Sequence, residues 1–517
     1  MANTEQIYDA KVQVKETGPH VHTLELLSTD AELKSSKFQR GIAVFGRVFS
    51  QVSGVEARGI QRVADDERQP PAPNTYTRIF LLWLSSALTG NNIIVGLYGP
   101  SLYGLDWTQA TICATLGVIL GSMCVGYMST WGPKSGNRTL VVTRYFLGYY
   151  LSKVCCLLNI LTMLGYGMVN CILGGQVIYT VSGGRTAVPV GIIVVSILTW
   201  FIATLGVHLF QFYTSHRYAW IIQILTLAIM IGSAGPSFIT SPFSTPDIPR
   251  ATASDWLSFF SLCFASAITW APASADYFVY FPTATSSWRM FLAGSTGMSL
   301  AMALTTLLGI GLATGIDSNP AWIEASLTSP GSLLAASFSN LHGFGRFCAV
   351  ILLLGTVSNN IPCTYSAGLN LQMLGRYGPR IPRPLLTTLE VVIYTVCAIV
   401  AREYLREIME NFLPLMSYWI VAWLAVCLEE TWVFRRGRDY DWTVWNNPHR
   451  LPMGLAAGAS FVFGILGAVL GMSQSYFVGP IAKALPQNCD LGMWLAFGFT
   501  AVVYPAFRCV ELHVVGR

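Results

Sequence analysis

The stretch LSSALTGNNIIVGLYGP, residues 84–100, decides the fold that this sequence predicts. It belongs to an apolar run that is long enough to cross a bilayer. Four residues interrupt that run near its middle: Thr89, Gly90, Asn91 and Asn92. Lipid offers no hydrogen bonds, so an irregular backbone at that depth survives only where protein or a water-filled cavity satisfies it. The stretch is therefore expected to be a broken helix.

Two later apolar runs carry similar interruptions. The run ASAITWAPASADYFVYFP, residues 265–282, is interrupted at Trp270, Ala271 and Pro272. The run around GTVSNNIPCTYS, residues 355–366, holds two adjacent Asn residues followed by a proline. Proline removes a backbone donor and breaks or kinks a helix interior. We expect three broken helices whose interruptions meet halfway across the membrane.

The composition is that of a polytopic membrane protein. Of 517 residues, 53% are hydrophobic and only 11% are charged, and the mean hydropathy is +0.51. A soluble protein carries about 25% charged residues. The basic residues form no dense patch with interleaved aromatics, which argues against a nucleic-acid partner. Most of the 12 Cys lie in apolar runs without metal-ligand spacing, so no metal site is expected.

Twelve apolar segments are long enough to span a bilayer. They lie near residues 79–100, 107–131, 150–181, 187–208, 217–236, 256–281, 289–313, 343–373, 384–401, 405–432, 452–472 and 489–511. Residues 1–78 are polar and are interpreted as a cytosolic tail, and residues 512–517 as a short cytosolic C-terminus. Placing both termini in the cytosol leaves few basic residues on the opposite face: Arg185, Arg250, Arg346, Arg402, Arg406 and Lys483. This bias favours that orientation.

The positions of the interruptions indicate an inverted repeat. The first and sixth segments are corresponding members of two sets of five, residues 79–236 and 256–432, followed by two extra segments in 452–511. An odd repeat length inverts the second set, and interrupted helices at matching positions mark a transporter's substrate site. The alternative is that Gly and Pro are simply common in membrane helices.

Side chains suited to a flat ring lie in the third, sixth and eighth segments. Tyr166 and Asn170 are four residues apart and share a helix face, so a ring could stack on one and hydrogen-bond the other. Trp270 lies at the break of the sixth segment, where an interfacial role is harder to explain than a stacking role. Asn359 and Asn360 each offer two donors and an acceptor, which match a nucleobase edge. The alternative for these polar residues is hydrogen bonding between helices.

Seven stretches resemble the fungal purine–cytosine permeases of the nucleobase:cation symporter family. In chain order they are GIQRVADDER, GLYGP, NCILGGQ, SADYFVYFP, SNNIP, DWTVWNNPHRLPMGLAA and YFVGPIA. The resemblance implies an all-α LeuT-like fold with five plus five helices and two extra. It also implies proton-coupled uptake of cytosine and purines such as adenine, guanine and hypoxanthine across the plasma membrane, with H⁺ as the coupling ion and no cofactor.

The resemblance also implies which residues bind the solute. The binding groups fall on the first, third, sixth and eighth segments: Thr89, Asn91, Asn92, Tyr166, Asn170, Trp270, Asn359, Asn360, Pro362 and Cys363. Tyr166 stands where the family more often has Trp, and Cys363 replaces the last Asn of an Asn-Asn-hydrophobic-Pro-Asn motif. A thiol does not replace an amide's paired donor and acceptor. This departure leaves open an altered purine range or another ring solute such as pyridoxine.

The predicted mechanism is alternating access around a mid-membrane site. The solute would lie between Trp270 and Tyr166, with Asn170 and one of the two adjacent Asn residues reading its edge. Asp276 and Glu390 are the candidates for proton coupling, because an acid inside a membrane segment is a functional candidate by default. Asp276 could equally hold a helix end.

An enzyme and a nutrient sensor are the two other classes of function. A membrane-embedded enzyme needs buried His, paired acids or a nucleophile with its base, and the sequence shows no such constellation. A nutrient sensor on the same fold stays an alternative, because it would share these motifs. The sequence thus predicts a transporter whose partners are a small ring solute and the lipid bilayer.

Overall fold

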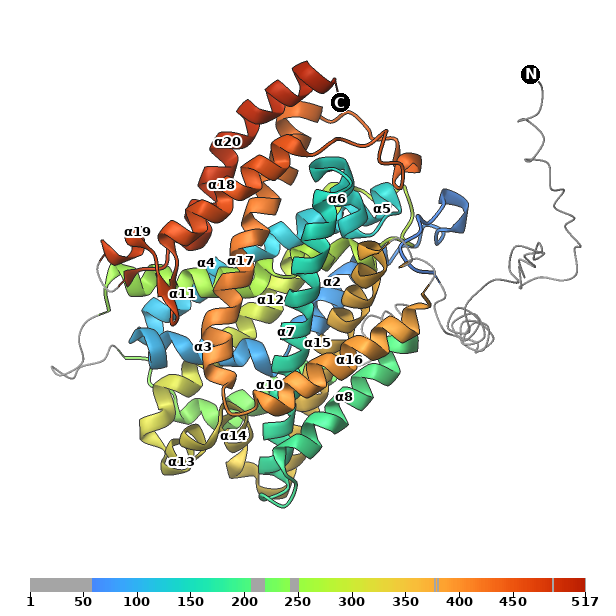
Figure 1. Cartoon of the computed structure of the whole chain (residues 1–517). Helices are drawn as coiled ribbons and strands as arrows, with labels where there is room; N and C mark the ends of the chain where they lie inside the picture. The colour runs from blue at the N-terminus through green and yellow to red at the C-terminus, as the bar shows by residue number, and fades with distance from the viewer. Residues whose placement is uncertain are drawn as a thin grey trace, which may run out of the picture. The chain divides into compact units, whose positions relative to one another are not determined.

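The computed structural model describes residues 58–205, 219–241, 251–375, 378, 381–485 and 488–516 (Figure 1). Most of the predicted N-terminal tail, the end of the fourth predicted segment and the start of the fifth lie outside these residues. The described chain is built from helices, with one two-stranded antiparallel ribbon of β1 (Ser473–Gln474) and β2 (Phe477–Val478).

The first predicted repeat contains six long helices. They are α2 (Thr75–Ala87), α3 (Gly90–Tyr103), α4 (Trp107–Ser129), α7 (Leu151–Val181), α8 (Val188–Leu205) and α10 (Ala219–Ala234). Two short helices, α5 (Trp131–Ser135) and α6 (Thr139–Leu147), connect α4 to α7.

The second predicted repeat and the C-terminal part follow. They contain α11 (Ala253–Ile268), the 3₁₀ helix η5 (Ala271–Tyr277), α12 (Ser287–Gly315), α13 (Pro320–Thr328), α14 (Pro330–Ala336), α15 (His342–Leu374), α16 (Arg383–Val400), α17 (Leu405–Glu429), α18 (Leu455–Gly471), α19 (Pro480–Lys483) and α20 (Gly492–Val515).

The helices fit a membrane-spanning protein. Within the described residues, nine helices are long and apolar enough to cross a bilayer, and the bent pair α2–α3 makes a tenth. Two shorter apolar helices, Val188–Thr204 and α18, lie where the fourth and eleventh segments were predicted. The arrangement is compatible with twelve spans.

Two of the three predicted breaks are confirmed. The axes of α2 and α3 differ by 60°, and Thr89, with extended backbone, separates them. In the sixth segment α11 ends at Ile268, and a tighter 3₁₀ helix with Pro272 in its first turn follows Trp270.

The third predicted break is wrong, because α15 runs unbroken through Pro362. Proline costs a helix interior one hydrogen bond. The adjacent amides do not compete for the helix backbone, since both reach neighbouring helices instead. Asn359 Nδ2 donates to the carbonyl of Ser86 at 2.8 Å, and Asn360 Nδ2 to Thr199 Oγ1 at 3.4 Å. Tertiary hydrogen bonds and burial thus keep α15 continuous.

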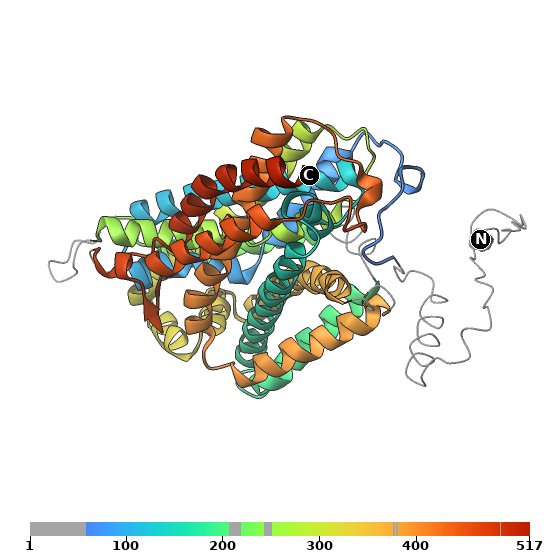
Figure 2. The same ribbon diagram turned by 45° about the horizontal axis from the view of Figure 1, so that its top comes forward.

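Nine of the long helices pack in two groups (Figures 1 and 2), and α17, α18 and α20 pack with one another. The first group holds α2, α3, α4, α11 and α12, and the second holds α7, α8, α15 and α16. In the first group α3 and α12 approach to backbone contact, since a Cβ added at Gly309 would lie 1.9 Å from the carbonyl oxygen of Ile93. The candidate site lies where α2 and α3 of the first group, together with η5, meet α7 and α15 of the second.

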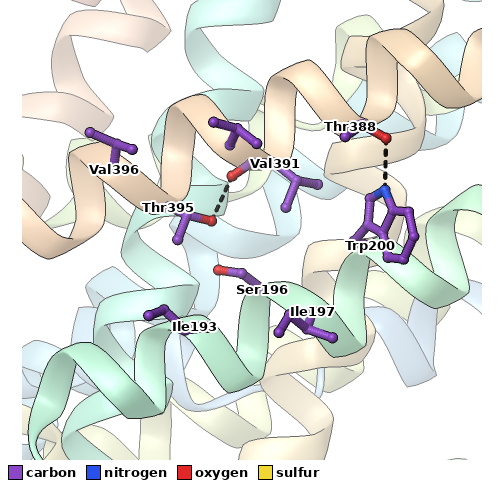
Figure 3. A pocket seen from close by; sticks show the side chains of 9 residues that line it. Ile193, Ser196, Ile197, Trp200, Thr388, Val391, Thr395 and Val396 are labelled. Atoms are coloured by element: carbon purple, nitrogen blue, oxygen red, sulfur yellow. Dashed lines mark hydrogen bonds between the residues drawn. The ribbon is translucent and has the colours of Figure 1, made fainter.

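In the second group α8 and α16 enclose a groove of about 290 Å³ (Figure 3). Its lining is almost wholly apolar, and Trp200 Nε1 donates to Thr388 Oγ1 at 2.8 Å at one end. Ile197 and Val396 in its walls are more than half exposed. Side chains of this kind on a spanning helix face lipid, so the groove is distinct from the candidate site.

Residues 58–69, which include the whole GIQRVADDER motif, dock beside α5. Val63 N donates to Gly136 O at 2.9 Å, and Gln69 N donates to Tyr280 O at 2.8 Å, just beyond η5. Within the segment, the Arg58 guanidinium hydrogen-bonds both carboxylate oxygens of Glu67 and lowers the pKa of that carboxyl to about 2. The segment 58–69, which precedes α2, is therefore hydrogen-bonded both to the end of α5 and to the chain just after η5.

Candidate substrate site

The break between α2 and α3 leaves carbonyl groups without helical partners, and two amides satisfy them. Asn92 Nδ2 donates to the carbonyl of Ala87 at 2.8 Å, and Asn359 Nδ2 donates to that of Ser86 at 2.8 Å. Thr89 Oγ1 donates to Asn91 Oδ1. The polar residues of the first interruption and one amide of α15 therefore stabilise the broken backbone.

A pair of amides links α7 to α15. Asn170 Nδ2 donates to Asn359 Oδ1 at 3.0 Å, so Asn359 is engaged on both sides. The remaining acceptor, Asn170 Oδ1, is fully buried and has no hydrogen-bond partner among the described residues. A buried polar atom without a partner costs about 1–3 kcal/mol. Asn170 therefore presents an acceptor that a donor on a bound solute would satisfy.

Asn360 faces away from this pair. Its Nδ2 lies 3.4 Å from Thr199 Oγ1 on α8 and 3.6 Å from Cys171 Sγ on α7. Adjacent residues of a helix point about 100° apart. Accordingly, Asn359 lies beside Asn170 and the α2 break, while Asn360 joins α15 to α8 and α7.

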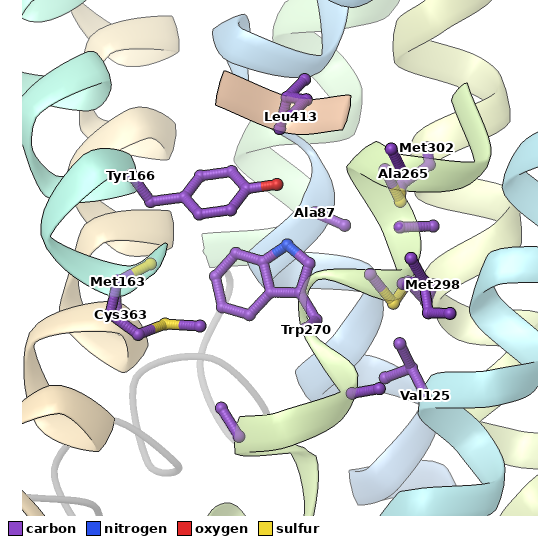
Figure 4. Close-up of a cluster of buried hydrophobic side chains, with 14 of the residues drawn as sticks. Ala87, Val125, Met163, Tyr166, Ala265, Trp270, Met298, Met302, Cys363 and Leu413 are labelled. Carbon is purple, nitrogen blue, oxygen red and sulfur yellow. The ribbon is translucent and has the colours of Figure 1, made fainter. Parts of the chain in front are cut away.

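Tyr166 and Trp270 meet directly (Figure 4). Their ring centroids are 5.5 Å apart and the planes are tilted by 42°. The Tyr166 hydroxyl shares a 2.6 Å hydrogen bond with Thr269 Oγ1 and lies 3.2 Å from the Ser266 carbonyl, so the end of α11 fixes the phenol. A ring between two stacked faces needs about 7 Å from face to face. In this structure the two rings therefore pack on each other, and they must separate to admit a third.

Cys363 and Pro362 belong to the same region. Cys363 is buried in the same cluster of side chains as Trp270 (Figure 4), and its thiol donates to the carbonyl of Asn359 at 3.4 Å. The carbonyl of Pro362 accepts from the Tyr277 hydroxyl at 3.0 Å. The residue that departs from the family motif thus belongs to the same buried cluster as the aromatic pair.

Asp276 lies apart from the aromatic pair, at the start of α6. Its Oδ1 accepts from Thr139 N at 2.7 Å, and its Oδ2 accepts from Ser366 Oγ on α15 at 2.7 Å. Arg138 Nη1 donates to the Asp276 backbone carbonyl at 2.5 Å. A carboxylate at a helix N-terminus is stabilising. Asp276 thereby joins η5, α6 and α15 at one buried point.

Glu390 has the opposite surroundings. It is buried on α16, and neither carboxylate oxygen has a hydrogen-bond partner among the described residues. Glu390 belongs neither to the Tyr166–Trp270 pair nor to the Asn170–Asn359 pair.

Sequence reasoning missed several groups at the site. Thr269 and Ser266 hydrogen-bond the Tyr166 hydroxyl, the Ser86 carbonyl accepts from Asn359, and Met163 belongs to the same buried cluster as Trp270 (Figure 4). The position of Thr269 directly before the predicted break was a usable signal. The Ser86 carbonyl had none, because a backbone atom acquires its role only from the folded geometry.

Comparison with known proteins gives the family. A family model described as "Permease for cytosine/purines, uracil, thiamine, allantoin" matches residues 73–495. The vitamin B6 transporter TPN1 of Saccharomyces cerevisiae is 29% identical over 98% of this chain and 96% of its own. The purine-cytosine permease fcyB of Emericella nidulans is 31% identical over 95% of this chain and 96% of its own.

Solved structures share the fold. Mhp1, a nucleobase-cation-symport-1 family transporter, in a closed conformation with bromovinylhydantoin bound, aligns with a TM-score of 0.63 over 90% of this chain and 96% of its own. The inward-facing conformation of Mhp1 gives a TM-score of 0.61 over 89% of this chain and 96% of its own. The identities are 12% and 15%, so these likenesses show the fold, which is the LeuT-like inverted repeat.

Proposed function

Because the chain belongs to the family of permeases for cytosine and purines, uracil, thiamine and allantoin, we propose that it imports nucleobases by proton symport. The solutes are cytosine and purines such as adenine, guanine and hypoxanthine. The chain is a multi-pass membrane transporter and not an enzyme. We place it in the plasma membrane with both termini in the cytosol.

The observation that carries the proposal is the buried, unpartnered Oδ1 of Asn170 one helical turn from Tyr166. A nucleobase offers a flat face for the aromatic pair and a ring N–H for that oxygen. The described side chains of the candidate site, Asn170, Asn359, Tyr166, Trp270 and Cys363, carry no formal charge. A neutral ring therefore suits the site better than an ion, which would need a buried counter-charge.

In the proposed cycle the two rings separate to admit the solute, and Asn170 replaces a lost water hydrogen bond on its edge. The site then opens to alternate sides as the two helix groups move against each other. The hydrogen bonds of Asp276 between η5, α6 and α15 would hold one side closed.

Pyridoxine is the second candidate, and two observations favour it. The full-length relative TPN1 is a vitamin B6 transporter, and Cys363 replaces an amide beside the aromatic pair. A thiol removes a paired donor and acceptor that a nucleobase edge would use, while a hydroxypyridine needs only single hydrogen bonds.

A competition panel tests the proposal. Radiolabelled cytosine uptake is measured in cells that lack their own permeases, with unlabelled adenine, hypoxanthine, uracil and pyridoxine as competitors, at two external pH values. We expect saturable accumulation that purines inhibit and that rises at the lower pH. Accumulation of labelled pyridoxine without cytosine would favour the second candidate. Binding without accumulation would identify a sensor and contradict the proposal.

A further inference from the structure

The two intramembrane acids differ in how the protein surrounds them. Both oxygens of Asp276 accept hydrogen bonds, from the amide and hydroxyl of Thr139 and the hydroxyl of Ser366. Glu390 is equally buried, and neither of its oxygens has a hydrogen-bond partner among the described residues. An ionised carboxylate that loses its water without gaining donors is costly. Hydrogen bonds therefore stabilise the ionised form of Asp276, whereas Glu390 has none among the described residues.

The position of Glu390 relates it to the solute site. Thr387, Glu390 and Tyr394 share the buried face of α16. At one end of this face, a Cβ at Gly368 of α15 would lie 3.0 Å from Thr387 Oγ1. At the other end, a Cβ at Gly167 of α7 would lie 2.7 Å from the Tyr394 ring. Glu390 thus faces the seam between the helices that carry Asn170 and Cys363.

No cation on the packed helices neutralises Glu390 within the described part of the chain. The titratable groups near it are Cys363 of α15, Tyr394 of its own helix and, beside Tyr394, Cys171 of α7. The sequence of α8 contains no titratable residue. Arg383 lies two turns away and directs its guanidinium to the carbonyls of Ala203 and Thr204, at 3.3 and 3.0 Å.

We propose that Glu390, and not Asp276, carries the coupled proton. This inference rests on the proposed function. The carboxyl O–H bond forms with a proton from the outer solution while the site is open outward. It breaks after closure, when the proton passes to water on the inner side, and no electron is transferred. Cys363 and Asn170 lie on the two helices of the seam, so a solute that moves them alters the surroundings of the carboxyl.

The test uses purified full-length protein in liposomes that contain a pH-sensitive dye. Tritiated cytosine and tritiated pyridoxine are assayed in parallel for accumulation, for solute-driven acidification and for exchange against internal unlabelled solute. The variant Glu390→Gln keeps the shape and removes the titratable proton. We expect it to lose at least about 90% of acidification and accumulation and to retain exchange. Glu407→Gln, an exposed position near the start of α17, is the matched control and should behave like wild type.

Wild-type acidification in Glu390→Gln would overturn the inference. If that variant loses exchange as well, Glu390→Asp decides. Acidification restored by Glu390→Asp supports a proton role. If Glu390→Asp has wild-type thermal stability and shows no acidification, the proton role is contradicted. Failure of the wild-type protein to accumulate or exchange either solute would overturn the proposed function, which is a separate result.

Discussion

At the residue scale, Asn170 supplies the contact on which the proposed recognition depends. Replacing Asn170 by Ala removes both the side-chain hydrogen bond to Asn359 and the unpartnered acceptor. A lost hydrogen bond at a buried site costs about 1–3 kcal/mol, which corresponds to a decrease in apparent affinity of about 5- to 150-fold. We expect uptake to fall by that factor while the protein still reaches the cell surface. Initial uptake rates over a range of solute concentrations measure the loss of uptake, and surface labelling measures the amount of protein at the cell surface.

The control for this substitution is Asn411→Ala, at a partly exposed position near the start of α17. It should leave uptake unchanged. Full activity of Asn170→Ala at wild-type surface density would remove Asn170 from the site.

Cys363 is the second residue for which we predict an effect. Exchanging Cys363 for Asn restores the family's amide beside Trp270, so preference should shift towards cytosine. A bidentate contact that one solute makes and another does not is worth about 1–3 kcal/mol, so the ratio of inhibition constants for cytosine and pyridoxine should change by about tenfold. An unchanged ratio would show that this position does not contact the ring. Cys363→Ser serves as the isosteric control.

Much of the candidate site could be predicted, because its residue types are unusual at membrane depth. Tyr166, Asn170, Asn359, Trp270 and Cys363 do lie together. Their pairing could not be predicted, since it depends on which helices face each other. The sequence predicts that Asn359 or Asn360 reads the solute; it does not predict that Asn359 donates to the Ser86 carbonyl and accepts from the Asn170 amide.

At the element scale, the contact between α3 and α12 allows a stability prediction. Gly309→Ala would place a methyl group 1.9 Å from the Ile93 carbonyl oxygen, so the two helices must move apart. Overpacking of this kind costs about 1–3 kcal/mol. We expect a lower thermal transition in detergent and reduced uptake. Gly498→Ala on α20, where a Cβ meets no heavy atom within 4 Å, is the matched control. Equal transitions for both variants would contradict the close packing.

The helices themselves were predictable where local chemistry and tertiary structure agree. The helix is broken at Thr89-Gly90, where glycine has a low helix propensity and Thr89 has an extended backbone. Pro362 illustrates the opposite case. Its local effect predicted a break, but burial between α2, α7, α8 and α16 keeps α15 continuous. A single lost backbone hydrogen bond is small beside the packing of a 33-residue helix.

At the scale of the whole molecule, Asp276 connects elements from both helix groups, since η5 extends α11 of the first group and α15 belongs to the second. Asp276→Asn should weaken the hydrogen bonds to Thr139 N and Ser366 Oγ. The side of the site that these bonds are proposed to hold closed should then open more often. We therefore expect maleimide labelling of the buried Cys363 to be at least about fivefold faster, with the exposed Cys509 as internal reference. Mass spectrometry of the labelled peptides measures the labelling rates of Cys363 and Cys509.

Asp317→Asn, at an exposed position in the 3₁₀ helix after α12, is the control and should label like wild type. Equal labelling of Cys363 in Asp276→Asn and wild type would show that Asp276 holds no gate.

The docked segment 58–69 supports a pH prediction. Arg58 lowers the pKa of Glu67 to about 2, below its ordinary value of 4.5. A group with a depressed pKa in the folded state stabilises that state above its ordinary value, and this contribution is lost as the pH falls towards 2. Glu67 is therefore ionised throughout pH 5–8. We expect Glu67→Gln to leave the shape of the uptake–pH profile unchanged over that interval. A shifted midpoint would contradict this.

The described site residues Asn170, Asn359, Tyr166, Trp270 and Cys363 carry no formal charge, and this has an electrical consequence. A neutral ring bound there adds nothing to the charge that crosses the bilayer, so the proposed symport with one proton would move a single positive charge in every turnover. A membrane voltage of 100 mV, negative inside, then contributes about 2.3 kcal/mol to each import event. That driving force alone sustains a solute gradient of roughly 50-fold. Inward current should therefore accompany solute addition even with no pH difference across the membrane.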